Sequence, residues 1–135
     1  MISARPSLRI FSIVLLALAL SAFAAPVDDF SGTYTLGAAA AAGKDVQLTI
    51  MLNVSNNTSS SISNATISLH EPNAGRVIYG QLAGLALAAG HSTQVNGSFR
   101  IPQGLYESWK KGSSPAMSVT YRDAQGNPVQ AFIQF

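Results

Sequence analysis

A strict alternation of apolar and polar residues between positions 46 and 54 constrains the fold of this chain more than any other feature. The apolar set occupies every second position and consists of Val46, Leu48, Ile50, Leu52 and Val54. Successive side chains of a β-strand point to opposite faces, so the pattern predicts a strand with one buried face. A slip of one residue would expose the whole apolar set, and the register is therefore specified as well.

Similar short runs occur before and after this strand, separated by turn residues. They are "FSGTYTLG", "ATISLHEP", "GRVIYGQL", "TQVNGSFRIP", "AMSVTYR" and "PVQAFIQF". With no long amphipathic helix and no internal repeat between them, about seven strands at this spacing predict an all-β fold. We expect a single antiparallel β-sandwich with one core.

The same alternation assigns side chains in these runs to a face of the sheet. In "ATISLHEP" the outward residues are expected to be Thr66, Ser68 and His70. The last two runs form a hairpin around "DAQGN", where Gly126 and Asn127 tolerate a positive φ. Two segments are predicted to be irregular. "AAAAAGK" has too few alanines to nucleate a helix and is expected to be a loop with one helical turn at most. "LAGLALAAGHS" is expected to be an apolar link that a turn at Gly90 closes.

The first 24 residues have the three parts of a secretory signal peptide. Arg5 and Arg9 precede an apolar run at 10–20, and a small-residue cleavage site ends at Ala24. An uncleaved membrane anchor is the alternative, but a spanning helix needs about 20 apolar residues and this run is shorter. We therefore expect a signal peptide at 1–24, a segment at 25–44 with the first strand and the alanine-rich loop, and the rest of the sandwich at 45–135.

Cleavage changes the charge of the chain. The sequence has eight Lys and Arg against six Asp and Glu, and Arg5 and Arg9 leave with the signal peptide, so the mature part has six of each sign. A neutral domain lacks the clustered basic face that nucleic-acid binding requires. No membrane span is expected after cleavage. Cysteine is absent, so neither a disulfide nor a lipid-modified cysteine can form.

The segment "RIPQGLYESWKKGSSP" is predicted to contain a short helix at 103–111, after Pro102 and before Gly112. Its helical spacing puts Leu105, Tyr106 and Trp109 on one face. Aromatic residues at this spacing usually pack, so the face is expected to plug an end of the sandwich. The alternative is an exposed Tyr106 and Trp109 pair beside Lys110, which would suit stacking on a sugar ring or gripping a partner.

Catalytic and metal-binding signatures are weak. His70 follows an outward strand pattern and His91 follows a turn, and neither has the Gly-x-Ser-x-Gly context of a serine hydrolase. Two histidines without cysteine do not make a structural zinc site, and "DAQGN" lacks the further acidic ligands of a calcium loop. We therefore expect a domain that is not an enzyme, with no cofactor and no metal.

Three phrases resemble a known family. "NVSNNTSSSISNATISL", "LALAAGHSTQVNGSFRIP" and the closing hairpin are similar to the immunoglobulin-like domains of secreted bacterial proteins, in particular the CARDB type (cell-adhesion-related domain found in bacteria). The likeness covers residues 46–135. It implies an immunoglobulin-like sandwich that presents modules, binds partners or assists adhesion, with no shared catalytic residues to transfer.

The expected function follows from the signal peptide, the strand pattern and this resemblance. We expect an exported, periplasmic or extracellular domain that serves protein interaction, adhesion or envelope structure, with another envelope or extracellular protein as partner. The alternative is a small carbohydrate-binding module whose glycan stacks on Tyr106 and Trp109. A hydrolase remains a third class, which would need its histidines and carboxylates to converge in a pocket.

Overall fold

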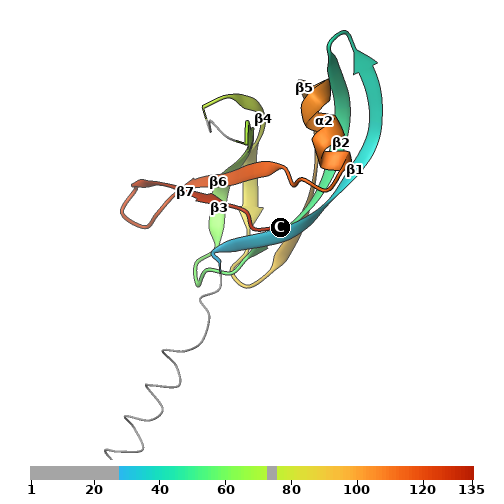
Figure 1. Cartoon of the computed structure of the whole chain (residues 1–135). Helices are drawn as coiled ribbons and strands as arrows, with labels where there is room; N and C mark the ends of the chain where they lie inside the picture. Colours follow the sequence, from blue (N-terminus) through green and yellow to red (C-terminus); the bar gives the residue numbers. More distant parts are fainter. Residues whose placement is uncertain (1–27, 73–75) are drawn as a thin grey trace, which may run out of the picture.

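Seven strands and one short helix follow one another along residues 28–72 and 76–135, the part of the chain that the computed structural model describes (Figure 1). They are β1 (Phe30–Ala42), β2 (Asp45–Asn56), β3 (Ile62–His70), β4 (Ile78–Leu87), β5 (Ser92–Pro102), α2 (Gln103–Lys110), β6 (Ala116–Arg122) and β7 (Pro128–Phe132). The predicted signal peptide lies outside the described residues. Within them, no helix has the length and apolar character needed to cross a membrane.

The strands form two antiparallel sheets packed face to face. One sheet has the order β1-β2-β5, and the other has the order β4-β3-β6-β7. This arrangement confirms the predicted antiparallel β-sandwich of seven strands, with one short helix between β5 and β6. The loops 57–61, 88–91 and 123–127 lie at one end of the sandwich, which we call the loop end. We call the opposite end, which carries α2, the helix end.

The core lies between the two sheets. All five apolar residues of the β2 alternation are buried, which confirms the predicted register, and inward residues of β3 and β6 pack opposite them. Phe99 of β5 is held between glycines. A Cβ at Gly97 would lie 2.6 Å from the Phe99 ring, and one at Gly80, on the facing sheet, would lie 2.5 Å from it. Only glycine lets the two backbones approach this ring so closely.

The alanine run differs from the prediction. It is the last part of β1, where Ala39, Ala40, Ala41 and Ala42 pair with Leu48, Gln47, Val46 and Asp45. Helix propensity is a weak preference, and pairing with a long neighbouring strand overrides it. A register shift between Leu36 and Ala39 accommodates the run.

One smaller prediction also fails, and the predicted last hairpin is confirmed. The predicted apolar link after residue 81 is strand as far as Leu87, and only the turn at Gly90 (φ +71°) is as expected. In the last hairpin Gly126 has a φ of +80°, whereas no residue other than glycine among those described has a positive φ. Asn127 therefore has a negative φ, and Gly126 is the residue of this turn that adopts the left-handed conformation.

The outer face of β3 is the third correction. Ser68 and His70 were expected to face solvent, but their exposed fractions are 3% and 2%. β3 is a central strand with β4 on one side and β6 on the other. Side chains from neighbouring strands cover its outer face, which the period of a single strand cannot reveal.

The end of the chain closes one side of the sandwich. The Gln134 N–H donates to the Phe30 carbonyl oxygen, and the Gly32 N–H donates to the Gln134 carbonyl oxygen, both at 3.0 Å. Ser31 and Gln134 thus form a parallel bridge. The segment after β7 leaves its own sheet and runs beside β1, as Figure 1 shows near the C label. The first and last strands are joined by this contact.

Candidate interaction surfaces

The helix α2 seats its aromatic face against the helix end of the sandwich. The exposed fraction of Trp109 is 4%, and Leu105 and Tyr106 are half-buried against the core. The Trp109 indole Nε1 is itself buried and has no hydrogen-bond partner. A sugar could stack on Trp109 only if the helix moved away from the sheets. This placement agrees with the plug that the sequence pattern favoured.

The other two predicted site residues, Tyr106 and Lys110, contact each other. The Lys110 Nζ lies 4.8 Å from the centroid of the Tyr106 ring and 3.0 Å from the Glu107 carboxylate oxygen Oε1. Lys110 therefore covers the ring that a sugar would need and is itself ion-paired. Trp109, Tyr106 and Lys110 are neighbours on one helix, but they do not form an open aromatic platform.

Local chemistry sets the limits of α2. Pro102 precedes it, with a fixed φ and no N–H to leave unsatisfied. At the other end Gly112 has a φ of +114°, and the Gly112 N–H donates to the Trp109 carbonyl oxygen at 3.2 Å. The helix therefore ends where Gly112 permits the chain to change direction, and residues 113–115 then lead to β6.

A cleft of about 510 Å³ lies beside α2 at the helix end. Its wall on the sheet side consists of Glu71, Pro72 and Tyr79, and its wall on the helix side includes Trp109 and Ser114. Burial, and then the negative charges of Glu71 and Asp45, raise the pKa of Tyr79 above its ordinary value. The phenol and the Glu71 carboxylate therefore interact electrostatically along the same wall of the cleft.

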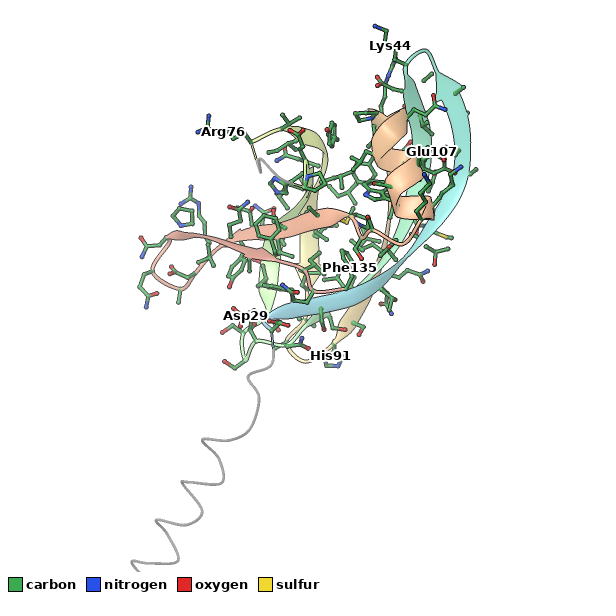
Figure 2. All side chains as sticks on the ribbon, viewed as in Figure 1. Asp29, Lys44, Arg76, His91, Glu107 and Phe135 are labelled. Atoms are coloured by element: carbon green, nitrogen blue, oxygen red, sulfur yellow. The ribbon has the colours of Figure 1, made fainter. Side chains whose placement is uncertain are left out.

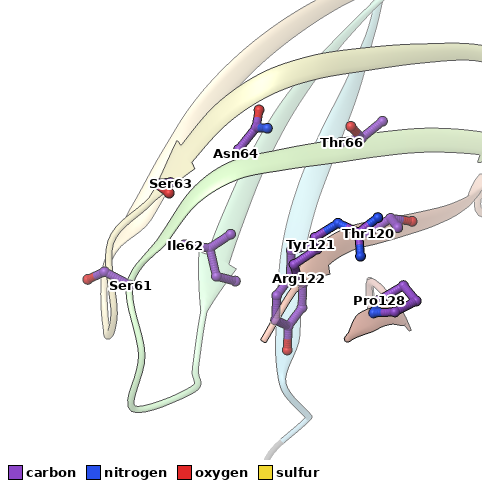
Figure 3. A pocket seen from close by; sticks show the side chains of 9 residues that line it. All are labelled: Ser61, Ile62, Ser63, Asn64, Thr66, Thr120, Tyr121, Arg122 and Pro128. Atoms are coloured by element: carbon purple, nitrogen blue, oxygen red, sulfur yellow. The ribbon is translucent and has the colours of Figure 1, made fainter. Parts of the chain in front are cut away.

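A second hollow, a groove of about 350 Å³, opens where β3 and β6 diverge toward the loop end (Figure 3). The pairing of β3 with β6 ends at Thr66 and Thr120, although β3 begins four residues earlier, at Ile62. Figure 3 shows Asn64 on one side of this groove and Arg122 on the other. The Arg122 guanidinium donates to the Gly126 carbonyl oxygen at 2.8 Å, so it also braces the β6–β7 turn.

The polar row on the outer face of β3 and β6 includes a serine–histidine contact. His70 Nε2 and Ser118 Oγ lie 2.7 Å apart, and Gln130 Nε2 donates to the same hydroxyl at 3.2 Å. Phe132 lies over His70 with ring centroids 5.3 Å apart, and the exposed fraction of Ser118 is 0%. A substrate carbonyl could reach this hydroxyl only after Phe132 had moved, so the geometry is that of a structural polar contact.

β1 is one of the two outer strands of its sheet, and most of its second side is unpaired among the described residues. β2 pairs with one side of β1 except at Gly37 and Ala38, whereas the bridge with Gln134 covers only the first residues of the other side. We define the β1 edge as residues 33–42. Figure 2 shows Phe135 beside the lower part of β1 and Lys44 at the tip of the β1–β2 hairpin, beyond this edge. The β1 edge itself carries no charge and no proline.

The remaining candidates have structural roles. In "DAQGN", which was predicted to be a hairpin turn, the Asp123 side chain accepts hydrogen bonds from the backbone N–H groups of Gln125 and Asn127 and so stabilises that turn. His91 is exposed at the loop end, close to Asp29 in Figure 2, and its ring contacts the Ala89 carbonyl oxygen. No group of three or more His, Cys, Asp or Glu residues suited to a metal occurs within 28–72 and 76–135.

Two of these surfaces carry no signal in the sequence. The cleft brings Glu71 and Tyr79 next to Ser114, and no spacing rule connects residues so far apart. The β1 edge has no local signal because a run of alanines has no period of two and does not predict a strand. No model of a known protein family matches the sequence, and no curated protein is similar to it.

Proposed function

We propose that this chain is an exported, non-enzymatic domain that binds another envelope or extracellular protein by adding a strand of that protein to the β1 edge. The predicted signal peptide and the resemblance to bacterial adhesion-related domains support export and a binding role. The observation that carries the proposal is the free edge itself, residues 33–42, of which eight pair with β2 while the second side of the strand is open.

Unpaired N–H and C=O groups along a strand are a template for another strand. Proteins usually protect such edges with lysine, proline or very short strands, but residues 33–42 include neither lysine nor proline, and β1 is 13 residues long. The register shift near Leu36 is the one such protection in this strand. Ala38, Ala39, Ala40 and Ala41 are exposed and small, so an incoming backbone can approach without displacing side chains.

The other strand edges are less suitable. β7 has five residues and begins with Pro128, which has no N–H to donate. β4 has a glycine in a left-handed conformation at Gly84 (φ +70°) and three register shifts in its pairing with β3. An added strand would therefore meet an interrupted edge there. β5, the other outer strand of the same sheet, carries the charged residue Arg100 and ends at Pro102, whereas the β1 edge carries neither charge nor proline.

The proposal is tested by placing lysines on the β1 edge. The chain from residue 25 onward, carrying an affinity tag, is used to recover partners from the envelope fraction of the source organism. We expect the double variant Ala38→Lys with Ala40→Lys to lose the protein that the unmodified domain recovers, because two buried ammonium groups would oppose strand pairing. Hydrogen exchange should show that amides of residues 33–42 become protected in the recovered complex.

A matched control places the same charge on the outer face of the same sheet. Asn53 and Asn96 are exposed on β2 and β5, away from the β1 edge. The double variant Asn53→Lys with Asn96→Lys should recover the partner as the unmodified domain does. Equal recovery by the edge variant, or protection confined to another surface, would refute the proposal.

A further inference from the structure

The cleft at the helix end has features of a second binding site, separate from the β1 edge. It lies between α2 and the end of β3, and its volume of about 510 Å³ is in the range of pockets that hold a side chain or a small ligand. Leu105 and Trp109 of α2 form part of one wall, and Pro72 and Tyr79 form part of the other. Trp109 belongs to the core, and Tyr79 and Leu105 pack against it, so the core holds these parts of both walls in place.

The charge of the cleft is uncompensated. Two of the three acidic residues near α2 are paired, since Asp45 lies 3.0 Å from Arg100 and Glu107 lies 3.0 Å from Lys110. The third is Glu71, whose carboxylate has no ion pair with any of the described residues. A half-buried carboxylate without a cation attracts one more strongly than a carboxylate in bulk water does.

Two exposed or half-buried rings lie beside Glu71 in the cleft. They are the rings of Tyr79 and Pro72, whereas the Trp109 ring is 4% exposed and offers no stacking face. The hydroxyl group of Ser114 also lines the cleft and has no hydrogen bond to another described residue. A guanidinium group is a flat cation that stacks on such rings and binds a carboxylate through two parallel hydrogen bonds. An ammonium group gains less from this geometry because it is compact and strongly hydrated.

The geometry points to a binding site for an arginine side chain of a partner protein. Glu71 accepts hydrogen bonds from the guanidinium, Tyr79 and Pro72 supply the stacking surface, and the serine hydroxyl accepts a remaining N–H. The site is independent of strand addition at the β1 edge, because it lies on the other side of α2 and shares no lining residue with that edge.

The test uses N-acetyl-L-arginine amide as the probe and the chain from residue 25 onward, followed by amide and indole NMR signals. We expect saturable shifts at Glu71, Tyr79 and the Trp109 indole, with millimolar affinity. N-acetyl-L-citrulline amide has the same shape without the charge and should bind at least about tenfold more weakly. Glu71→Gln should weaken binding of the arginine probe by a similar factor.

Glu107→Gln is the matched control, because it removes a carboxylate of the same type, near the same helix, that is already paired with Lys110. It should change the affinity less than about twofold, since an exposed charge outside the cleft is screened. Shifts that map away from the cleft, or equal binding of the citrulline and arginine probes, would overturn the inference. So would a neutral sugar that shifts the same signals in the Glu71→Gln variant. If the double variant Ala38→Lys with Ala40→Lys still recovered the partner, strand addition would be refuted but the results with the arginine probe would be unaffected.

Discussion

Asn56 shows how a buried polar residue is accommodated in this domain. Its exposed fraction is 0%, and its amide nitrogen donates to the carbonyl oxygens of Ser60 and Leu87 at 3.0 and 2.9 Å. Its amide oxygen accepts from the Thr58 hydroxyl at 2.6 Å. Asn56 thereby joins two loops at the loop end. A sugar could not be attached to it, although it begins one of five Asn-x-Ser/Thr triplets in the sequence.

Trp109, unlike Asn56, buries a polar atom without a hydrogen bond. Among the described residues, its Nε1 is the one buried side-chain nitrogen or oxygen without a hydrogen-bond partner. An unsatisfied buried donor costs about 1–3 kcal/mol. The burial of the large indole ring must therefore outweigh this cost, which places Trp109 among the packing residues of the domain.

This balance predicts two different outcomes for substitution of Trp109. Trp109→Ala should lower the free energy of unfolding by about 3–5 kcal/mol, because it opens a large cavity. Trp109→Phe should cost about 1.5 kcal/mol or less, because loss of the unpaired N–H offsets part of the lost packing. Urea unfolding followed by circular dichroism measures both. Lys111→Ala, on the exposed side, should stay within about 0.5 kcal/mol of the unmodified domain, and an equally small effect of Trp109→Ala would contradict the packing role.

At the scale of elements, two glycines have opposite surroundings: Gly97 in β5 is crowded by its neighbours and Gly104 in α2 is not. Gly97 of β5 has the Phe99 ring and Leu82 within 3 Å of where a Cβ would lie. Gly104 of α2 has no atom within 4 Å of that position. The same substitution should therefore have opposite effects in the two elements.

Gly97→Ala should destabilise the domain by about 1–3 kcal/mol, because the Phe99 ring has no room to move toward Gly80. Gly104→Ala should stabilise it by about 0.5 kcal/mol, because alanine has the higher helix propensity and meets no neighbour. Thermal and urea unfolding of the two variants provide the measurement. If both variants changed the free energy of unfolding in the same direction, the close packing of Phe99 against Gly97 and Gly80 would be contradicted.

The elements also show which features the sequence can specify. Residues 46–54 of β2 were predicted because burial on one face leaves a period of two in the sequence itself. α2 was predicted because Pro102 and Gly112 bound it locally. The end of β1 was not, since alanines carry no period and only pairing with β2 makes them a strand. The burial of His70 depends on side chains of neighbouring strands, and the cleft at Glu71 depends on the packing of α2, so neither leaves a local signal.

At the scale of the whole molecule, tyrosines couple stability to alkaline pH at both ends of the sandwich. Tyr79 lies at the helix end, where its pKa is raised above 10.0 by burial and by Glu71 and Asp45. Tyr121 lies at the loop end, where its pKa is raised by burial and by Asp29 and Asp123. In the unfolded chain both phenols would ionise near their ordinary pKa of 10.0.

The unfolded state therefore loses these protons before the folded state does as pH rises. Stability is unaffected by these groups below about pH 9 and falls as pH rises through 10 and above. We expect the urea midpoint to drop between about pH 9 and about pH 11. The double variant Tyr79→Phe with Tyr121→Phe should show a shallower drop over the same range. An identical pH dependence in this variant would contradict the assignment.

The bridge between Ser31 and Gln134 has a mechanical consequence. The two segments run parallel, so a pull on residue 28 and an opposite pull on residue 135 slide them past each other along their length. The hydrogen bonds from Gln134 to Phe30 and from Gly32 to Gln134 then carry the load together in shear, and neither opens before the other as in a zipper. When the two ends of the domain are pulled apart, the bridge between Ser31 and Gln134 must therefore break before β1 can separate from β2.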